Sequence, residues 1–315
     1  MITNFNALCE LPFHDLHHQE FIRATGAWVH HTPTSLLNSK DLFQDTIESP
    51  EKNDDLRGRS HENYSESKYY TVKQSGTLFQ KAKRRNGFSM LHLNMRSLPK
   101  NLSLLEDLIT TVKEPPEIIA ISETKLKENN IHNINIPGYS VINTNSRTAA
   151  GGVSIYIANE LDFIRRRDIE LSGDNIESCW VEIRREKLKN VVIGCIYRHP
   201  SNDHQHFLET LREQLDNLNN KAKEVFILGD INVDFLKYND DHQTSEYLDM
   251  LLDQGFMPLI TKATRLTDHT STLIDHIYTN VLHKVIKAGI CLADVSDHLP
   301  IFCTDKISSA LDDTL

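Results

Sequence analysis

The sequence predicts an α/β fold in which two packed β-sheets are covered by helices. Three observations favour this architecture: short apolar runs typical of buried strands, amphipathic patterns typical of helices, and more strands than helices along the chain. This uneven mixture argues against the regular strand and helix alternation of a Rossmann fold. No internal repeat is visible, so we expect one large folded unit.

The individual elements follow from the spacing of apolar side chains. Continuous or alternating apolar runs predict β-strands at residues 88–94, 118–122, 152–157, 178–183, 191–197, 225–228, 273–278 and 299–303. Apolar residues three and four positions apart predict helices around residues 102–112, 207–218 and 247–252.

The first part of the chain lacks this pattern. Residues 1–86 have weak hydrophobic periodicity, and residues 48–67 are charged and polar, which is typical of a disordered linker. We therefore predict a poorly structured N-terminal segment over 1–86, a folded domain over 87–306 and a C-terminal tail over 307–315. The basic run KAKRR at 81–85 is typical of a solvated patch, a localisation signal or a phosphate-facing arm.

Composition restricts the class of protein. Hydrophobic residues make up 39% of the chain and charged residues 25%, with 12 glycines and 10 prolines, which excludes a collagenous or low-complexity protein. The net charge of −10 argues against a histone-like coat on nucleic acid, but not against an enzyme that grips a few phosphates. Five cysteines without a C-x-x-C pair indicate reduced thiols in an intracellular protein.

Neither a membrane segment nor a signal peptide is expected. No apolar run approaches the roughly 20 residues that cross a bilayer. The N-terminus also lacks the basic and then apolar pattern of a secretory signal. The sequence therefore predicts an intracellular protein without a membrane partner.

Polar side chains recur where the predicted strands end. In chain order they are Asn94, Glu123, Tyr197, Asp230 with Asn232, Asp275, and Asp297 with His298. Each one alone is typical of a helix cap or a turn. Together they form a set of carboxylates, amides and an imidazole, and open β-sheet proteins bind ligands at strand ends. The joint pattern predicts an active site.

These residue types are suited to hydrolysis of a phosphoester. A hard cation such as Mg²⁺ prefers carboxylate, water and substrate oxygens, and Glu123 with Asn94 or Asp297 can supply the protein side. A second carboxylate, Asp230, is expected to orient and deprotonate the attacking water. Asn232 is expected to hold that carboxylate or a phosphate oxygen.

Negative charge that develops on a phosphate needs hydrogen-bond donors nearby. His298 and Tyr197 are the predicted donors. A carboxylate that contacts the imidazole nitrogen on the side away from the phosphate keeps a histidine cationic and oriented. We assign this role to Asp275. A histidine nucleophile is disfavoured, because the Asp-His unit lies among carboxylates of metal-binding type.

The order of these motifs resembles the endonuclease/exonuclease/phosphatase superfamily over residues 88–306. The motifs are Leu93-Asn94, Ser122-Glu123-Thr124-Lys125, Tyr197, Gly229-Asp230-Ile231-Asn232, Ile274-Asp275-His276 and Ser296-Asp297-His298. The resemblance implies a four-layer α/β sandwich of two mixed sheets with helices outside. It also implies phosphoester cleavage that depends on Mg²⁺, with Mn²⁺ as a second possible cation.

The resemblance also implies a role for each matching residue. Glu123 is expected to be the principal metal ligand, assisted by Asn94 and Asp297. Asp230 is expected to activate water with support from Asn232. His298 is expected to pair with Asp275.

Further stretches are similar to the endonuclease of LINE-type, non-long-terminal-repeat retrotransposons of the jockey kind. They are residues 91–99, 151–156, 197–200, 263–267 and 271–280. This resemblance implies a nuclear enzyme that nicks one strand of double-stranded DNA for reverse transcription, with element RNA or reverse transcriptase as partners of a full-length relative. Arg198 and Thr264 are then expected to contact DNA or to shape the DNA-facing rim.

Two departures from these families affect the interpretation. Arg96 stands where repair-type abasic-site endonucleases carry an acidic or amide residue, which disfavours a repair enzyme. A retrotransposon polyprotein continues into a reverse transcriptase, whereas this sequence ends at Leu315, so a truncated open reading frame or a domesticated fragment is expected. An inositol-phosphate or sphingolipid phosphodiesterase of the same fold, and a non-catalytic remnant, stay as alternatives.

Overall fold

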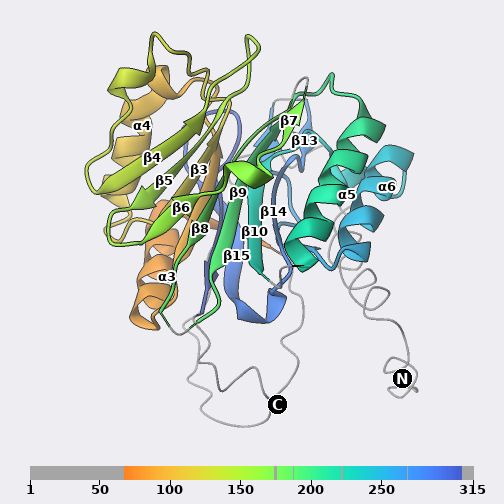
Figure 1. Cartoon of the computed structure of the whole chain (residues 1–315). Helices are drawn as coiled ribbons and strands as arrows, with labels where there is room; N and C mark the ends of the chain where they lie inside the picture. The colour runs from red at the N-terminus through yellow and green to blue at the C-terminus, as the bar shows by residue number, and fades with distance from the viewer. Residues whose placement is uncertain (1–66, 174–175, 187, 221–222, 268, 307–315) are drawn as a thin grey trace, which may run out of the picture.

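The structure is a computed structural model that describes residues 67–306 except for 174–175, 187, 221–222 and 268. Two mixed β-sheets pack face to face, and a pair of helices covers the outer face of each sheet (Figure 1). This arrangement confirms the four-layer α/β sandwich. The predicted C-terminal tail and residues 1–66 of the predicted N-terminal segment lie outside the described residues.

One sheet has the strand order β1-β15-β16-β2-β3-β5-β4. The bounds in that order are Lys68–Thr71, Val285–Leu292, Ile301–Asp305, Ser89–Asn94, Ile118–Ser122, Val153–Ala158 and Tyr139–Thr144. At its centre β2 and β3 are parallel, and β16 is antiparallel to β2. Its outer face is covered by α3 (Val72–Arg84) and α4 (Leu98–Thr111).

The other sheet has the strand order β11-β14-β10-β9-β8-β6, and β7 also pairs with β8. The bounds in that order, with β7 last, are Met257–Pro258, Asp275–Thr279, Glu224–Asp230, Val191–Arg198, Ile176–Ile183, Phe163–Arg165 and Ser172–Gly173. Here β9 and β10 are the parallel central pair. Its outer face is covered by α5 (His204–Asn220) and α6 (His242–Asp253).

Short elements complete the chain. A small hairpin joins β12 (Arg265–Leu266) to β13 (Ser271–Thr272). Single 3-10 turns are η2 to η5, at Ile131–Asn133, Arg167–Ile169, Phe235–Lys237 and Leu282–Lys284.

Strand β3 illustrates how the sheets are buried on both faces. Ile118 and Ala120 belong to the hydrophobic cluster between the two sheets, whereas Ile119 and Ile121 belong to the cluster under α3 and α4. Successive side chains of a strand point to opposite faces, so a strand covered on both faces has a continuous apolar run. The described cysteines are buried free thiols, as predicted: Cys179, Cys195, Cys291 and Cys303.

Each predicted strand and helix overlaps an observed one, with bounds that differ by up to five residues, but the prediction missed some strands. Strands β4 and β6 lie at sheet edges, and most of their residues are only half-buried, so they lack a continuous apolar run. Strand β15 is interrupted by Lys287 and Gly289, which weaken its apolar pattern. Sequence periodicity therefore found the central strands better than the outer ones.

The structure corrects the domain boundary that was predicted at residue 86. Strand β1 pairs in parallel with β15, and α3 packs on the same sheet. The Phe79 ring of α3 makes an edge contact with Phe302 of β16, with centroids 5.4 Å apart. The folded domain therefore includes residues 67–86.

Helix α3 escaped prediction because its buried face is built partly of small residues. Ser75 and Gly76 are buried beside Phe79 and Ala82, which gives a weak apolar stripe. A helix-start signal was nevertheless present, since Thr71 and Gln74 form a capping box. That local signal was a better guide here than hydrophobic periodicity.

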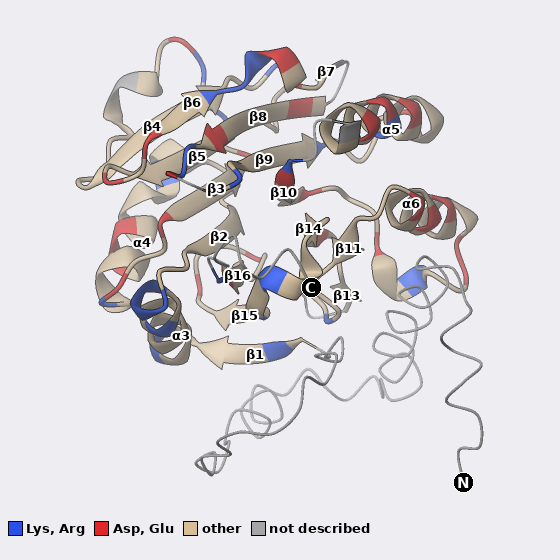
Figure 2. Ribbon diagram, turned by 60° about the horizontal axis from the view of Figure 1, so that its bottom comes forward, with Lys and Arg blue, Asp and Glu red and all other residues tan. Residues whose placement is uncertain are grey.

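The basic run at residues 81–85 lies at the C-terminal end of α3. Figure 2 shows Lys and Arg gathered on this helix, whereas Asp and Glu gather on α5 and α6. Helix α3 leads into the first residues of β2, and Asn94 is the last residue of that strand. The basic run therefore lies at the opposite end of the strand from the predicted catalytic residues.

We expect Phe79→Ala to lower the free energy of unfolding of the full chain by about 3 to 5 kcal/mol, because it removes a buried ring and leaves a cavity. The matched variant Lys73→Ala changes an exposed residue of the same helix and should stay within about 0.5 kcal/mol of the wild type. Denaturant unfolding measures both values. Equal stability of the two variants would mean that α3 is not part of the folded core.

Candidate active site

The predicted site residues gather at one end of the sandwich because of strand direction. Asn94 ends β2 beside Ser122 of β3, and Glu123 follows directly. In the other sheet Asp230, at the end of β10, lies opposite Tyr197 of β9 and Asp275 of β14. Parallel neighbours end at the same edge, and an antiparallel neighbour begins there.

Asn94 joins the two sheets by hydrogen bonds. Its Nδ2 donates to Oε1 of Glu123 at 2.9 Å and to Oδ2 of Asp230 at 2.8 Å. Its Oδ1 accepts from the backbone N–H of Arg96 at 3.0 Å. The side chain is buried, so these contacts hold both carboxylates in fixed positions. Asn94 thus presents its amide nitrogen, rather than its oxygen, to the site.

The turns that follow the strands have unusual backbone conformations. Arg96, Glu123, Lys125 and Asn232 have φ angles of 53°, 50°, 53° and 54°. Such left-handed conformations are uncommon for residues other than glycine and gather at functional sites. They persist only where neighbouring contacts hold them, and such contacts are present on both sheets.

Backbone hydrogen bonds hold the turn around Glu123. The N–H groups of Thr124 and Lys125 donate to the carbonyls of Gly152 and Gly151 at 3.1 and 2.8 Å. Gly152 has a φ of 82°, and a Cβ there would overlap the Thr124 hydroxyl. A glycine at position 152 is therefore required for this loop to approach the turn that carries Glu123.

His298, Asp275 and Thr264 form a buried chain of hydrogen bonds. Nδ1 of His298 lies 2.9 Å from Oδ2 of Asp275, and the Thr264 hydroxyl donates to the same oxygen at 2.7 Å. Burial disfavours a charged imidazole, but attraction and hydrogen bonding by Asp275 outweigh it and raise the pKa of His298 to about 9. The pairing predicted from sequence is confirmed in geometry, and His298 is cationic at neutral pH.

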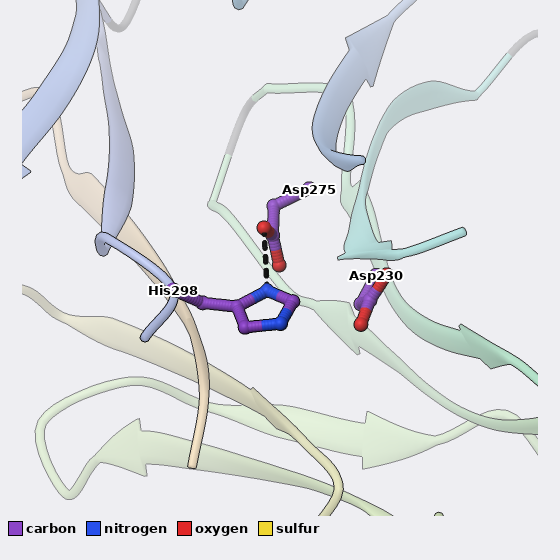
Figure 3. Close-up of side chains that lie close together, drawn as sticks. All are labelled: Asp230, Asp275 and His298. Atoms are coloured by element: carbon purple, nitrogen blue, oxygen red, sulfur yellow. Dashed lines mark hydrogen bonds and ion pairs between the residues drawn. The ribbon is translucent and has the colours of Figure 1, made fainter. Parts of the chain in front are cut away.

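Asp230 faces this pair across a small space. Figure 3 shows the His298 imidazole with both carboxylates beside it, and one ligand atom from each of the three residues lies within 4.8 Å of the others. Burial and the nearby charge of Asp275 raise the pKa of Asp230 to about 8, although His298 opposes this shift. The raised pKa makes the ionised Asp230 a stronger base, and this ionised form predominates only above about pH 8.

His92 is a residue of this site that the sequence interpretation missed. Its Nδ1 lies 3.9 Å from Oδ1 of Asp275, and its Nε2 lies 3.2 Å from the hydroxyl of Ser122. Burial lowers its pKa to about 4, so the ring is neutral. Its position in β2, two residues before Asn94, is the only sequence signal that pointed toward the site.

Asn232 and Tyr197 complete the predicted catalytic set. The backbone N–H of Asn232 donates to Oδ1 of Asp230 at 3.1 Å, and its Nδ2 donates to the Arg198 carbonyl at 2.8 Å. The backbone of Asn232 therefore supports the Asp230 carboxylate, whereas its side chain, which was expected to hold that carboxylate or a phosphate oxygen, donates to Arg198. Tyr197 is buried near the carboxylates of Glu123 and Asp230, and burial together with their charges raises its pKa.

Arg198 and Thr264, predicted to contact DNA, are both buried. Arg198 is 5% exposed, and its guanidinium donates to the carbonyls of Asn202 and Ile231 at 3.0 and 3.4 Å. Thr264 is fully buried against Asp275. The structure therefore gives both residues supporting contacts beneath the site, and DNA contact by either one stays a prediction.

Asp297, predicted as a metal ligand, is held by two arginines. Arg96 places Nε 2.6 Å from Oδ1 and Nη2 2.7 Å from Oδ2. Arg265 places Nε 2.9 Å from Oδ2. Neither arginine was among the predicted site residues, although Arg96 stood out as a departure from the repair enzymes.

The donor chemistry of the site fits a hard divalent cation. Glu123 is half-buried, and it lies with Asp230 on either side of the Asn94 amide. Carboxylate oxygens with water and phosphate oxygens are the ligands that Mg²⁺ prefers. The Asn94 oxygen and both Asp297 oxygens already contact Arg96 or Arg265. Among the described residues the side chain of Glu123 has a hydrogen bond only at Oε1, so its other oxygen makes it the principal candidate ligand.

The sequence profile of the endonuclease/exonuclease/phosphatase family matches residues 91–298. A search of curated protein sequences gave no match.

Among the described residues, no helix has the length and apolar character needed to cross a membrane.

Solved structures share the fold at low sequence identity. The endonuclease domain of TRAS1, a telomere-specific non-LTR retrotransposon, is 18% identical, with a TM-score of 0.54 over 70% of this chain and 98% of that one. AP endonuclease LMAP from Leishmania major is 13% identical, with a TM-score of 0.59 over 92% and 99%. An AP endonuclease from Archaeoglobus fulgidus is 17% identical, with a TM-score of 0.53 over 70% and 100%.

The family match begins on β2, which carries Asn94, and ends at His298. It therefore spans the strands and turns that supply the whole site. The chain belongs to the endonuclease/exonuclease/phosphatase family.

Proposed function

We propose that this protein is a metal-dependent endonuclease that nicks double-stranded DNA, of the kind encoded by non-LTR retrotransposons. One observation carries the proposal: a buried His298–Asp275 pair faces Asp230 at 4.8 Å or less, beside the Asn94–Glu123 bond. A cationic donor, a proton acceptor and a metal-type carboxylate are the groups that phosphodiester hydrolysis requires.

The similar structures support nucleic acid as the substrate. They include a retrotransposon endonuclease domain, AP endonucleases and a Neisseria 3′ phosphatase bound to a product DNA hairpin. The motifs at residues 91–99 and 271–280 favour the retrotransposon type over the repair type. Arg96, in place of an acidic or amide residue, points the same way.

Each side chain has a defined task in the proposed reaction. Asp230, held by Asn94 and by the Asn232 backbone, orients the attacking water and accepts its proton. His298 donates to the phosphate oxygen on which negative charge develops, and Asp275 keeps its ring protonated and aligned. Glu123 would hold Mg²⁺ or Mn²⁺, which supplies Lewis-acid stabilisation of that charge.

Thr264 and His92 act through Asp275. The Thr264 hydroxyl donates to Oδ2 of Asp275 and accepts from its backbone N–H at 3.2 Å. The neutral ring of His92 fills the space on the other side of the carboxylate, near Oδ1. These contacts fix the carboxylate that orients His298, so both are positioning residues.

We expect Glu123→Gln to lower the rate of plasmid nicking by about a hundredfold or more, because the metal ligand contributes several kcal/mol to the transition state. The matched variant Glu128→Gln changes an exposed residue of the same loop and should nick like the wild type. The conversion of supercoiled to relaxed plasmid in Mg²⁺, with EDTA as the metal-free arm, measures the rate.

Assays of the wild type on two further substrates, an inositol phosphate and a sphingolipid phosphodiester, separate the alternative functions. Turnover of an inositol phosphate or a sphingolipid phosphodiester without nicking would favour the phosphodiesterase alternative. No turnover of any of the three substrates would favour a non-catalytic remnant. Undiminished nicking by Glu123→Gln would overturn the metal assignment.

Asp275→Asn and His298→Ala should each lower the nicking rate by several powers of ten, and the double variant should be close to the worse single variant. The two residues share one function, so their losses do not add. Single-turnover nicking rates of the four proteins form the required cycle. A double variant that shows the full product of both losses would mean that the residues act independently.

A further inference from the structure

Arg96 and Arg265 converge on one carboxylate at the mouth of the site. Together their guanidinium groups place three nitrogens 2.6 to 2.9 Å from the two oxygens of Asp297. In the part of the chain that the structure describes, Asp297 is the only carboxylate paired with either arginine. Two positive charges against one negative charge leave this cluster with a net charge of +1.

Both arginines are attached to elements that carry catalytic residues. Arg96 follows β2 in a left-handed conformation, and its backbone N–H orients Asn94. Arg265 follows Thr264 directly and forms a backbone bridge with His298. The two guanidinium groups therefore meet at Asp297, the residue directly before the histidine that is proposed to face the scissile phosphate.

The cluster remains open to a ligand. The side chains of Arg96 and Arg265 are 47% and 35% exposed, in contrast to the buried Arg198. Guanidinium groups have five N–H donors in a planar fork that suits phosphate oxygens. Asp297 engages only part of this donor set, so each arginine keeps donors for a second anion.

We propose that Arg96 and Arg265 form a binding site for a backbone phosphate of the DNA strand beside the scissile phosphate, and that Asp297 orients them instead of holding the metal. This inference rests on the proposed function and names the residues that grip the strand. A cation on Asp297 would lie next to two guanidinium groups, and like charges at such distances repel. Glu123, by contrast, has no arginine partner among the described residues.

The first test measures binding of a short fluorescent DNA duplex in EDTA, where cleavage is absent. We expect Arg96→Ala and Arg265→Ala each to weaken binding about tenfold, because each loses a charge-assisted contact. Each should also reduce the slope of log K against log salt by about 1. Arg96→Lys keeps the charge but not the fork, so it should retain the slope and show intermediate affinity.

The matched control is Arg84→Ala, which changes an exposed arginine of α3 at the opposite end of β2. Its affinity and salt slope should equal those of the wild type. Unchanged affinity and slope in both Arg96→Ala and Arg265→Ala, with thermal transitions like that of the wild type, would overturn the phosphate site. If the wild type itself neither binds nor nicks DNA, the proposed function fails, and this inference fails with it.

The second test concerns Asp297 and uses Mn²⁺ binding followed by electron paramagnetic resonance. We expect Asp297→Asn to bind Mn²⁺ within about twofold of the wild type, and Glu123→Gln to bind it at least about tenfold more weakly. Tenfold weaker binding by Asp297→Asn would show that Asp297 is a metal ligand. That result would overturn the orienting role assigned to it.

Discussion

The face-to-face packing of two mixed sheets is the constraint on which the site depends. The central parallel pairs, β2 with β3 and β10 with β9, both end at the same edge of the sandwich. Asn94 crosses between them and bonds Glu123 of one sheet and Asp230 of the other. Any shift of one sheet against the other would separate these carboxylates, so the apolar layer between the sheets also sets the geometry of catalysis.

Burial then determines the protonation of the catalytic groups. A buried ion pair gains little net stability, because desolvation offsets the attraction. At this site the His298–Asp275 pair instead keeps the imidazole cationic. Burial and the charge of Asp275 raise the pKa of the Asp230 carboxyl to about 8. His92 is buried more deeply, has no hydrogen bond to Asp275 and lies near the charge of His298, so its pKa is lowered and its ring stays neutral. Burial, hydrogen bonding and neighbouring charges together separate the charged histidine from the uncharged one.

Burial also separates the arginines near the site into a buried one with a supporting role and two exposed ones. Arg198 lies beneath the Asp230–Asn232 turn, where its guanidinium donates to backbone carbonyls and stacks over the Phe207 ring at 5.2 Å. Arg96 and Arg265 lie at the rim around Asp297. The charge of a guanidinium is the same in each case, and burial decides which ones a substrate can reach.

The sequence by itself was sufficient for the central strands and for the residues at their ends. Apolar runs are local properties of the chain, and a polar residue such as Asn94 or Asp230 marks where a buried strand stops. Motif order then indicated the four-layer sandwich and the pairing of His298 with Asp275, both of which the structure bears out. Helix α3 was missed although its capping box was present, because its buried face is partly small residues.

Beyond the His298–Asp275 pair, only the tertiary structure decided which side chains are partners. Arg96 and Asp297 are 201 residues apart, and no local pattern indicates that they meet. The same holds for the burial of Arg198 and Thr264, which follows from how a strand and a loop are covered by other elements. Periodicity reports which face of an element is apolar, whereas contacts between distant residues depend on sheet order and on the packing of the layers.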